Sequence, residues 1–116
     1  MSLTVEEGTR TTGTPPEGAD VVLNSSTPET TTAIVQLLLD INALAAGDTL
    51  EVAMKEKVIS GGTQRIIHRF TIVNSSGADD AVWVSPAVFL KNGWDMTLKQ
   101  TAGSSRAIPW SIRKVT

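Results

Sequence analysis

His68 is the only histidine of the chain, and any search for catalytic chemistry begins with it. A Ser-His-Asp site needs a serine nucleophile, usually held on a sharp turn, whose proton the histidine accepts. No serine here stands in that sequence context, and His68 lies beside Phe70 in an alternating apolar segment. Cysteine and tyrosine are absent from the composition. We therefore predict that the protein is not an enzyme, has no catalytic residue and binds no cofactor.

Two groups of oxygen-bearing side chains have the chemistry of calcium ligands. They are Asp79 with Asp80, and Asp40 with Asn42 and Asp48. Neither group has the fixed ligand spacing of a calcium loop, so both are interpreted as solvated turns. Gly61 and Gly62 are not followed by a helical pattern, which favours a hairpin turn over a phosphate-binding loop. We predict no metal site.

Length and charge restrict the protein class. A chain of 116 residues is predicted to form one domain that buries roughly two thirds of its unfolded surface. No segment approaches the roughly 18 consecutive apolar residues of a membrane span, and the first residues lack a signal-peptide pattern. We expect a soluble protein made in the cytoplasm, with no membrane contact. The basic clusters are small and lack interleaved aromatic residues, so nucleic-acid binding is not expected.

Residues 1–32 differ in composition from the rest of the chain. They contain nine threonines and three prolines, and five acidic residues against one basic residue give a net charge of −4. Residues 33–116 carry nine basic and seven acidic residues, a net charge of +2. We predict an extended N-terminal arm rich in Thr, Pro and Gly, followed by a compact body. The arm is either a solvated tail or a segment that docks on a partner. The arm residues expected to touch a partner are Leu3, Val5, Arg10, Val21, Val22 and Leu23.

The body has an apolar period of two almost throughout, which indicates β-strands. The predicted strands cover residues 33–41, 47–58, 64–73, 82–90, 94–99 and 108–113, with one helical turn over residues 42–47. Pro86 interrupts the fourth of these, as is typical of an edge strand or a bulge. Short strands without a long helix predict an all-β fold, namely an antiparallel β-sandwich or a small jelly roll.

The same alternation assigns the core. The residues predicted to be buried are Leu37, Leu39, Val52, Met54, Phe70, Trp94, Leu98, Trp110 and Ile112. Trp83 has the opposite phase to Val82 and Val84, so it is predicted to be an exposed contact. Residues 33–41 and 64–73 carry apolar side chains on both faces. This pattern predicts that one of those faces packs against a neighbouring copy.

Three stretches of the body resemble small structural proteins of tailed bacteriophage virions. They are LDINALAAGDTLEVAMKEKVISGGTQR at residues 39–65, VWVSPAVFL at residues 82–90 and GWDMTLKQTAGSSRAIPWSIRKV at residues 93–115. The most distinctive pieces are AGDT at residues 46–49, TLKQTAG at residues 97–103 and PWSIR at residues 109–113. The resemblance covers about residues 33–115 and is to capsid decoration or cement proteins.

This resemblance implies an all-β protein that is often trimeric and binds the outer shell where capsomers meet, commonly with an extended N-terminal arm. We therefore expect the partners to be the major capsid protein and other copies of the chain, as a homotrimer. The expected location is the outer capsid surface of the virion, where the protein would stabilise the head. Two alternatives remain open: a receptor-binding module of a fibre or tail tip, and a carbohydrate-binding module, which would need an exposed aromatic platform.

Overall fold

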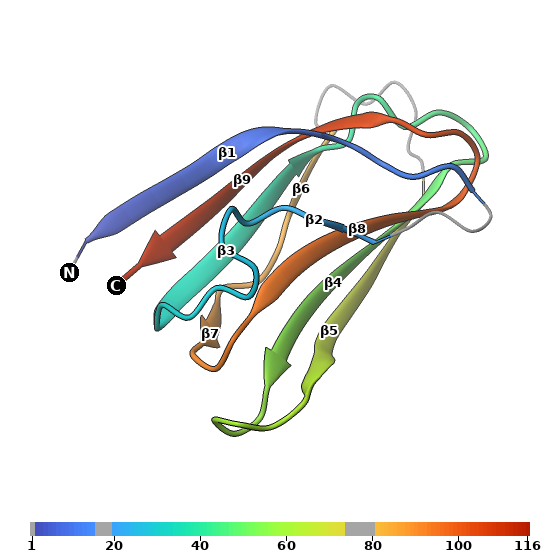
Figure 1. Cartoon of the computed structure of the whole chain (residues 1–116). Helices are drawn as coiled ribbons and strands as arrows, with labels where there is room; N and C mark the ends of the chain where they lie inside the picture. The colour runs from blue at the N-terminus through green and yellow to red at the C-terminus, as the bar shows by residue number, and fades with distance from the viewer. Residues whose placement is uncertain (1, 16–19, 74–80) are drawn as a thin grey trace.

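The structure is a computed structural model that describes residues 2–15, 20–73 and 81–116, in which nine strands form two antiparallel sheets. Figure 1 shows the two sheets packed face to face, with no helix in the described residues. The predicted all-β sandwich is thus confirmed. The strands are β1 (Leu3–Thr11), β2 (Val21–Val22), β3 (Ala33–Asp40), β4 (Thr49–Lys57), β5 (Gln64–Val73), β6 (Val82–Val84), β7 (Val88–Leu90), β8 (Asp95–Ala102) and β9 (Ala107–Val115).

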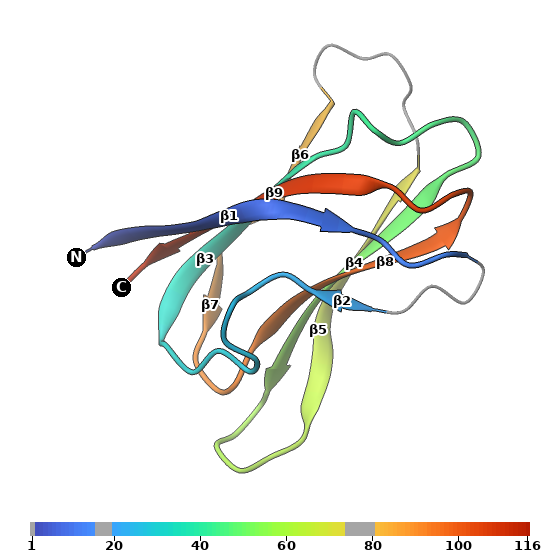
Figure 2. The ribbon, with the colours of Figure 1, turned by 45° about the horizontal axis from the view of Figure 1, so that its top comes forward.

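The strand order is that of a jelly roll. One sheet, here called sheet A, has the order β1-β9-β3-β6, with β7 also paired to β3, and sheet B has the order β2-β8-β4-β5. Apart from the β4–β5 hairpin and the β6–β7 step, each connection carries the chain from one sheet to the other (Figure 2). If β6 and β7 are counted as one interrupted strand, the two sheets have four strands each, as in a double-sheet jelly roll.

The core lies between the sheets and is built from the alternating positions of their central strands. Val35, Leu37 and Leu39 of β3 pack against strands of sheet B, where Val52 and Leu98 are also buried. Trp94 is fully buried, and its Nε1 donates a hydrogen bond to the carbonyl oxygen of Thr31 at 3.0 Å. Met54 and Ile112 are buried as well, while Phe70 and Trp110 are half-buried against the core.

The described part of the N-terminal segment lies on the body. β1 pairs with β9 along its whole length, and β2 pairs with β8. Leu23 joins the core, and Thr12 and Asn24 are buried polar residues that bond to sheet B. The described residues of the predicted arm thus include two extended segments, β1 and β2, that lie against the body. The segment obtains its burial from strands that come much later in the chain, which its own composition does not reveal.

Two connections differ from, or refine, the expectation. Residues 42–47 form two tight turns, closed by Leu44 N to Ile41 O at 3.1 Å and Asp48 N to Ala45 O at 3.0 Å, where we predicted a helical turn. The predicted interruption at Pro86 is present between β6 and β7. Ser85 continues the ladder there, because its Oγ accepts the Leu37 N–H at 2.9 Å.

Candidate functional site

The outer face of sheet A carries exposed apolar side chains in rows that cross the strands. This face, called the outer face below, points away from sheet B, and two paired rows show its character. The first row runs across four strands and consists of Leu3, Val115, Ile34 and Phe89. Four residues further along β1, a mixed row consists of the polar residues Glu7 and Ser111 and the apolar residues Leu38 and Val84. Phe89 is 81% exposed and Leu3 is 68% exposed. Large exposed apolar surfaces of this kind mark interaction sites on soluble proteins.

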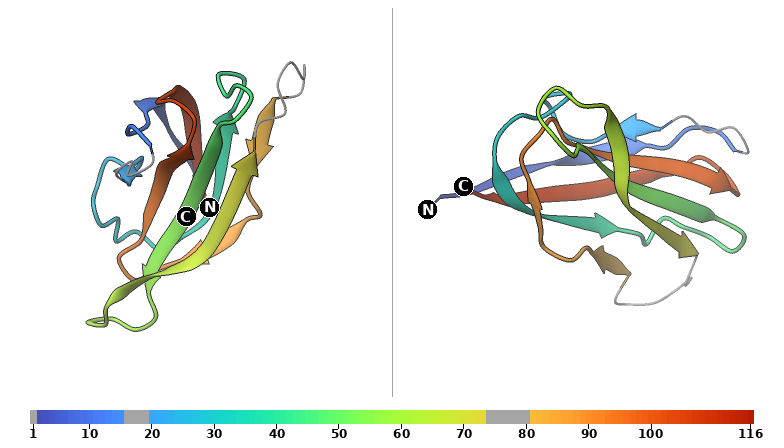
Figure 3. Two further views of the ribbon diagram at one scale, coloured as in Figure 1. Left: turned by 90° about the vertical axis from the view of Figure 1, so that its right-hand side faces the viewer. Right: turned by 90° about the horizontal axis from the view of Figure 1, so that it is seen from below.

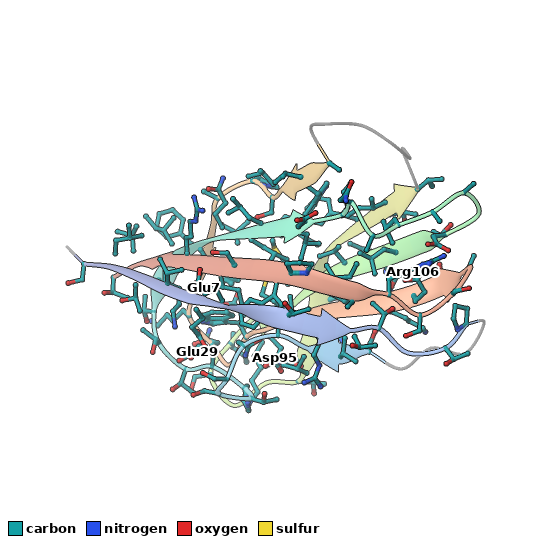
Figure 4. The ribbon with its side chains drawn as sticks, turned by 90° about the horizontal axis from the view of Figure 1, so that it is seen from above. Glu7, Glu29, Asp95 and Arg106 are labelled. Carbon is teal, nitrogen blue, oxygen red and sulfur yellow. The ribbon has the colours of Figure 1, made fainter. Side chains whose placement is uncertain are left out.

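A shallow hollow of about 210 Å³ extends this surface toward the far end of the sheet. Leu38, Val82, Pro109 and Trp110 are among the residues that line it, together with Arg113. Charged groups on the outer face are few, and Glu7 is one of them, on β1 (Figure 4). The face is therefore suited to a partner that offers mainly apolar surface with a small number of polar groups.

Sheet B presents a different outer surface. Lys55 pairs with Asp20 at 3.0 Å, and Arg69 pairs with Glu51 at 3.3 Å, both at least partly exposed to solvent. Arg69 and Glu51 lie on the neighbouring strands β5 and β4, whereas Asp20 precedes β2, two strands away from Lys55 in β4. Exposed apolar residues are fewer in this sheet than in sheet A; they are Ile66 and Val73 on β5. The contrast between the two outer surfaces makes the outer face of sheet A the better candidate for binding.

The distinctive motifs at residues 46–49 and 97–103 meet at one end of the sandwich. Asp48 is 1% exposed, and its Oδ2 accepts a hydrogen bond from Arg106 Nε at 2.7 Å and from Ala45 N at 2.7 Å. Its Oδ1 accepts the Ser104 N–H at 3.1 Å. The bond from Arg106 is the largest effect on the Asp48 pKa; despite burial, these bonds hold it below its ordinary value. Asp48 therefore fixes the β8–β9 connection, near whose end Arg106 is seen in Figure 4.

A second charged cluster holds β1 and the segment before β3 to the body. Lys114 Nζ donates to Glu6 Oε2 at 2.6 Å and lies 3.9 Å from Glu29 Oε2. Burial alone would raise the pKa of each glutamate, but hydrogen bonds and Lys114 bring both below the ordinary value. For Glu6 the bonds come from Lys114 and Ser25, and for Glu29 they come from Thr31. The cluster is structural, since it ties three separate parts of the chain together.

The arm residues predicted to contact a partner have different surroundings. Leu3 and Val5 lie on the outer face and are exposed, and Arg10 is exposed on the opposite side of β1. Val21 and Val22 are half-buried in β2. Leu23 is buried in the core, so in this structure it offers nothing to a partner.

Trp83 does not occupy the exposed position that we predicted. It is paired with Leu39, whose side chain points into the core, and it packs against that core. Its ring lies 5.0 Å from the Phe70 ring, centroid to centroid. Val82 and Val84 are the exposed residues of β6, so the phase of this strand is the reverse of the predicted one. The pairing with β3 sets that phase, and three residues are too few for alternation to decide it.

His68 lies on β5, exposed, with its ring stacked on Phe70 at 6.1 Å between centroids. Of the suggested calcium ligands, Asp40 accepts the Asn42 N–H at 3.0 Å, while Asp48 is used by Arg106. Asp79 and Asp80 lie outside the described residues. Within the described ranges, no group of three or more His, Asp or Glu side chains is arranged to hold a metal ion.

Sequence reasoning did not predict that several residues of the outer face would be contact residues. They are Ile34, Leu38, Val82, Val84, Phe89 and Val115. One signal was present, because residues 33–41 are apolar on both faces. The direction of the Phe89 side chain depends on how β7 resumes pairing with β3 after Pro86, and the local sequence pattern does not predict this pairing.

In the described ranges, no helix has the length and apolar character needed to cross a membrane. Comparison of the chain with protein-family models, with curated proteins and with solved structures gave no match.

Proposed function

We propose that this chain is a non-enzymatic structural protein of a bacteriophage virion that binds the outer surface of the capsid and stabilises the head. The observation that carries the proposal is the exposed apolar outer face, which includes Leu3, Ile34 and Phe89. The resemblance of residues 39–65, 82–90 and 93–115 to capsid decoration proteins supports the class of partner. Jelly rolls serve many functions, so the fold by itself does not choose among them.

The physical basis is linkage between binding and assembly. A protein that binds only the assembled shell adds its binding free energy to that state and so opposes disassembly. Burying the outer face removes apolar surface from water, and each Å² removed contributes roughly 25 cal/mol of favourable free energy to binding. We further propose that the bodies gather as a homotrimer on the particle, where several weak contacts with the major capsid protein act together.

The proposal is tested by adding purified protein to bare capsids and measuring bound copies and the temperature at which the capsids open. Phe89→Ser should reduce occupancy at least about tenfold, because the exposed ring would be central to the contact. Val58→Ser is the matched control. Val58 is 78% exposed, but it directly follows β4, a strand of sheet B, and so lies away from the outer face. Near-ultraviolet circular dichroism checks that both variants remain folded.

Equal occupancy for the two variants would show that the outer face is not the contact. Unchanged capsid stability, combined with loss of attachment to host cells when the protein is missing, would instead favour a receptor-binding module.

A further inference from the structure

Five strands form the edges of the two sheets, and four of them are protected against pairing with another chain. β2 has two residues, and β6 and β7 have three residues each and are separated at Pro86. β5 pairs with β4 across a register shift after Met54 and carries Arg65, His68 and Arg69. Short length, interruption, bulges and charge are the usual ways in which proteins prevent edge-to-edge association.

β1 is the edge that lacks most of these features. It has nine residues, contains no proline and keeps a regular register with β9 from Leu3 to Thr11. Figure 3 shows β1 at the border of its sheet, with β9 on one side only. A long, regular edge strand is a template for an additional strand.

The backbone groups that remain free on β1 can be identified from its pairing with β9. Ser2 and Thr116 exchange both of their N–H to carbonyl bonds, at 3.0 Å each, and Thr12 N donates to Arg106 O at 2.9 Å. Antiparallel partners alternate between bonded and non-bonded pairs, so the even-numbered residues of β1 bond to β9. The odd-numbered residues therefore direct their N–H and C=O groups outward; they are Leu3, Val5, Glu7, Thr9 and Thr11. Among the described residues, none supplies a backbone partner to these groups.

We propose that this free edge pairs with β1 of a second copy of the chain, antiparallel and about a twofold axis at Gly8. The pairing would join two sheets A into one continuous sheet. This pairing requires neither a capsid nor the outer face, so its test is independent of the test of the proposed function.

Charge selects the register. The outward groups can bond to each other only when odd-numbered residues face odd-numbered residues of the second copy. An axis at Glu7 would oppose two Glu7 carboxylates, and like charges directly opposite each other destabilise a sheet. An axis at Gly8 places Arg10 opposite Glu6 of the second copy, twice by symmetry, in close non-bonded pairs.

Both members of this pair are suited to it. Arg10 is exposed and forms no ion pair with any described residue. Glu6 accepts bonds from Ser25 on Oε1 and from Lys114 on Oε2. A carboxylate offers about four acceptor positions, so Glu6 has room for one more donor. In this register Glu7 lies opposite Thr9, which avoids the repulsion between the two Glu7 carboxylates.

The pairing also has a consequence for the outer face. In an antiparallel pair, directly opposed residues project to the same side of the sheet. The two outer faces would therefore lie side by side and face the same way, doubling the apolar surface offered to a partner. Because the contact is twofold symmetric, pairing of two β1 strands uses up both free edges and gives a closed dimer. The homotrimer expected on the particle would use other surfaces.

The natural absence of cysteine allows a direct test of the register with single-cysteine variants. Gly8→Cys would lie on the twofold axis in a non-bonded pair, where Cα atoms are about 4.5 Å apart and within disulfide range. A Cβ at Gly8 would lie in van der Waals contact with its nearest neighbour, the Trp110 ring, at 3.4 Å. Glu7→Cys and Thr9→Cys are the matched controls, one residue to either side.

We expect reversible dimers in sedimentation equilibrium, and under mild oxidation Gly8→Cys should cross-link at least about fivefold more than either control. Arg10→Glu should weaken the dimer at least about tenfold, while Arg65→Glu, on the edge strand of the other sheet, should leave it unchanged. Thermal melting of each variant verifies folding. A monomer at all concentrations with equal, low cross-linking would overturn the proposal, as would a trimer with no cross-link at Gly8. Preferential cross-linking at Glu7 or Thr9 would place the axis elsewhere and refute the charge argument.

Discussion

Gly103 is the position at which the structure makes its sharpest prediction about stability. Its φ is +87°, and a methyl group placed on it would lie 1.8 Å from Asp48 Oδ1 and 2.8 Å from Asp48 Cα. Gly103→Ala must therefore displace the loop or the buried Asp48 carboxylate. Either movement breaks the hydrogen bonds that Asp48 accepts from Ser104 and Arg106.

Two contributions set the magnitude. A left-handed conformation costs a residue with a Cβ about 1–2 kcal/mol, and that term is shared by any glycine with a similar φ. Hydrogen bonds to a charged group are worth about 1.5–3 kcal/mol each, and Arg106 is partly exposed, which reduces its share. We expect Gly103→Ala to lower the free energy of unfolding by about 3–5 kcal/mol.

Gly61→Ala is the matched control, because Gly61 has a φ of +82° and no atom lies within 4 Å of its hypothetical Cβ. Gly61→Ala should lower the free energy of unfolding by about 1 kcal/mol. Both substitutions reduce the entropy of the unfolded state by the same amount, so this effect cancels in the comparison. Urea denaturation of the two variants beside the natural chain measures the difference. If Gly103→Ala and Gly61→Ala have equal costs, the close approach of Gly103 to Asp48 is not present in solution.

Other expectations concern buried aromatic and charged groups. Trp94→Ala should lower the unfolding free energy by about 3–5 kcal/mol, whereas Trp83→Ala, on an edge strand and half-buried, should cost less; equal costs in chemical denaturation would contradict the placement of Trp83. Glu6 and Glu29 have pKa values below the ordinary 4.5, so their contribution is present above about pH 5 and is lost as the pH falls through the folded-state pKa values, which melting temperatures from pH 7 to pH 3 would follow. Lys114→Met should lower stability at pH 7 by about 2–3 kcal/mol and flatten that acid dependence; an unchanged acid dependence would mean that Lys114 does not lower the pKa of either glutamate.

The strands of the body could be predicted because each of them has one face in the core. Alternation placed the third predicted strand at residues 64–73, and β5 covers the same residues. Alternation also predicted that Trp94 and Trp110 face the interior. In the structure Trp94 is buried and Trp110 is half-buried against the core. Alternation fails where pairing with a distant strand decides the phase. Trp83 is such a case, since its direction follows from β3, more than forty residues earlier.

β1 shows why the N-terminal segment was harder to predict than the body. Its inward positions are polar or lack a side chain. Glu6 faces Lys114, and Gly8 lies beside the Trp110 ring, from which a Cβ at position 8 would be 3.4 Å away. Its apolar residues Leu3 and Val5 point to the exposed side. Read by alternation alone, β1 would have been placed with the opposite face inward, or left off the body altogether.

That inversion is itself informative about the outer face. A strand that directs its apolar residues outward gains nothing from them in the isolated fold, yet Leu3 lies in one row with Val115, Ile34 and Phe89, which come from three other strands. Agreement among four strands that are far apart in sequence is not explained by the local needs of any one of them. Departures from the pattern that folding alone favours are expected where a protein binds. The inverted pattern of β1 therefore points to the same surface as the exposure of Phe89, and the Phe89→Ser binding experiment tests both.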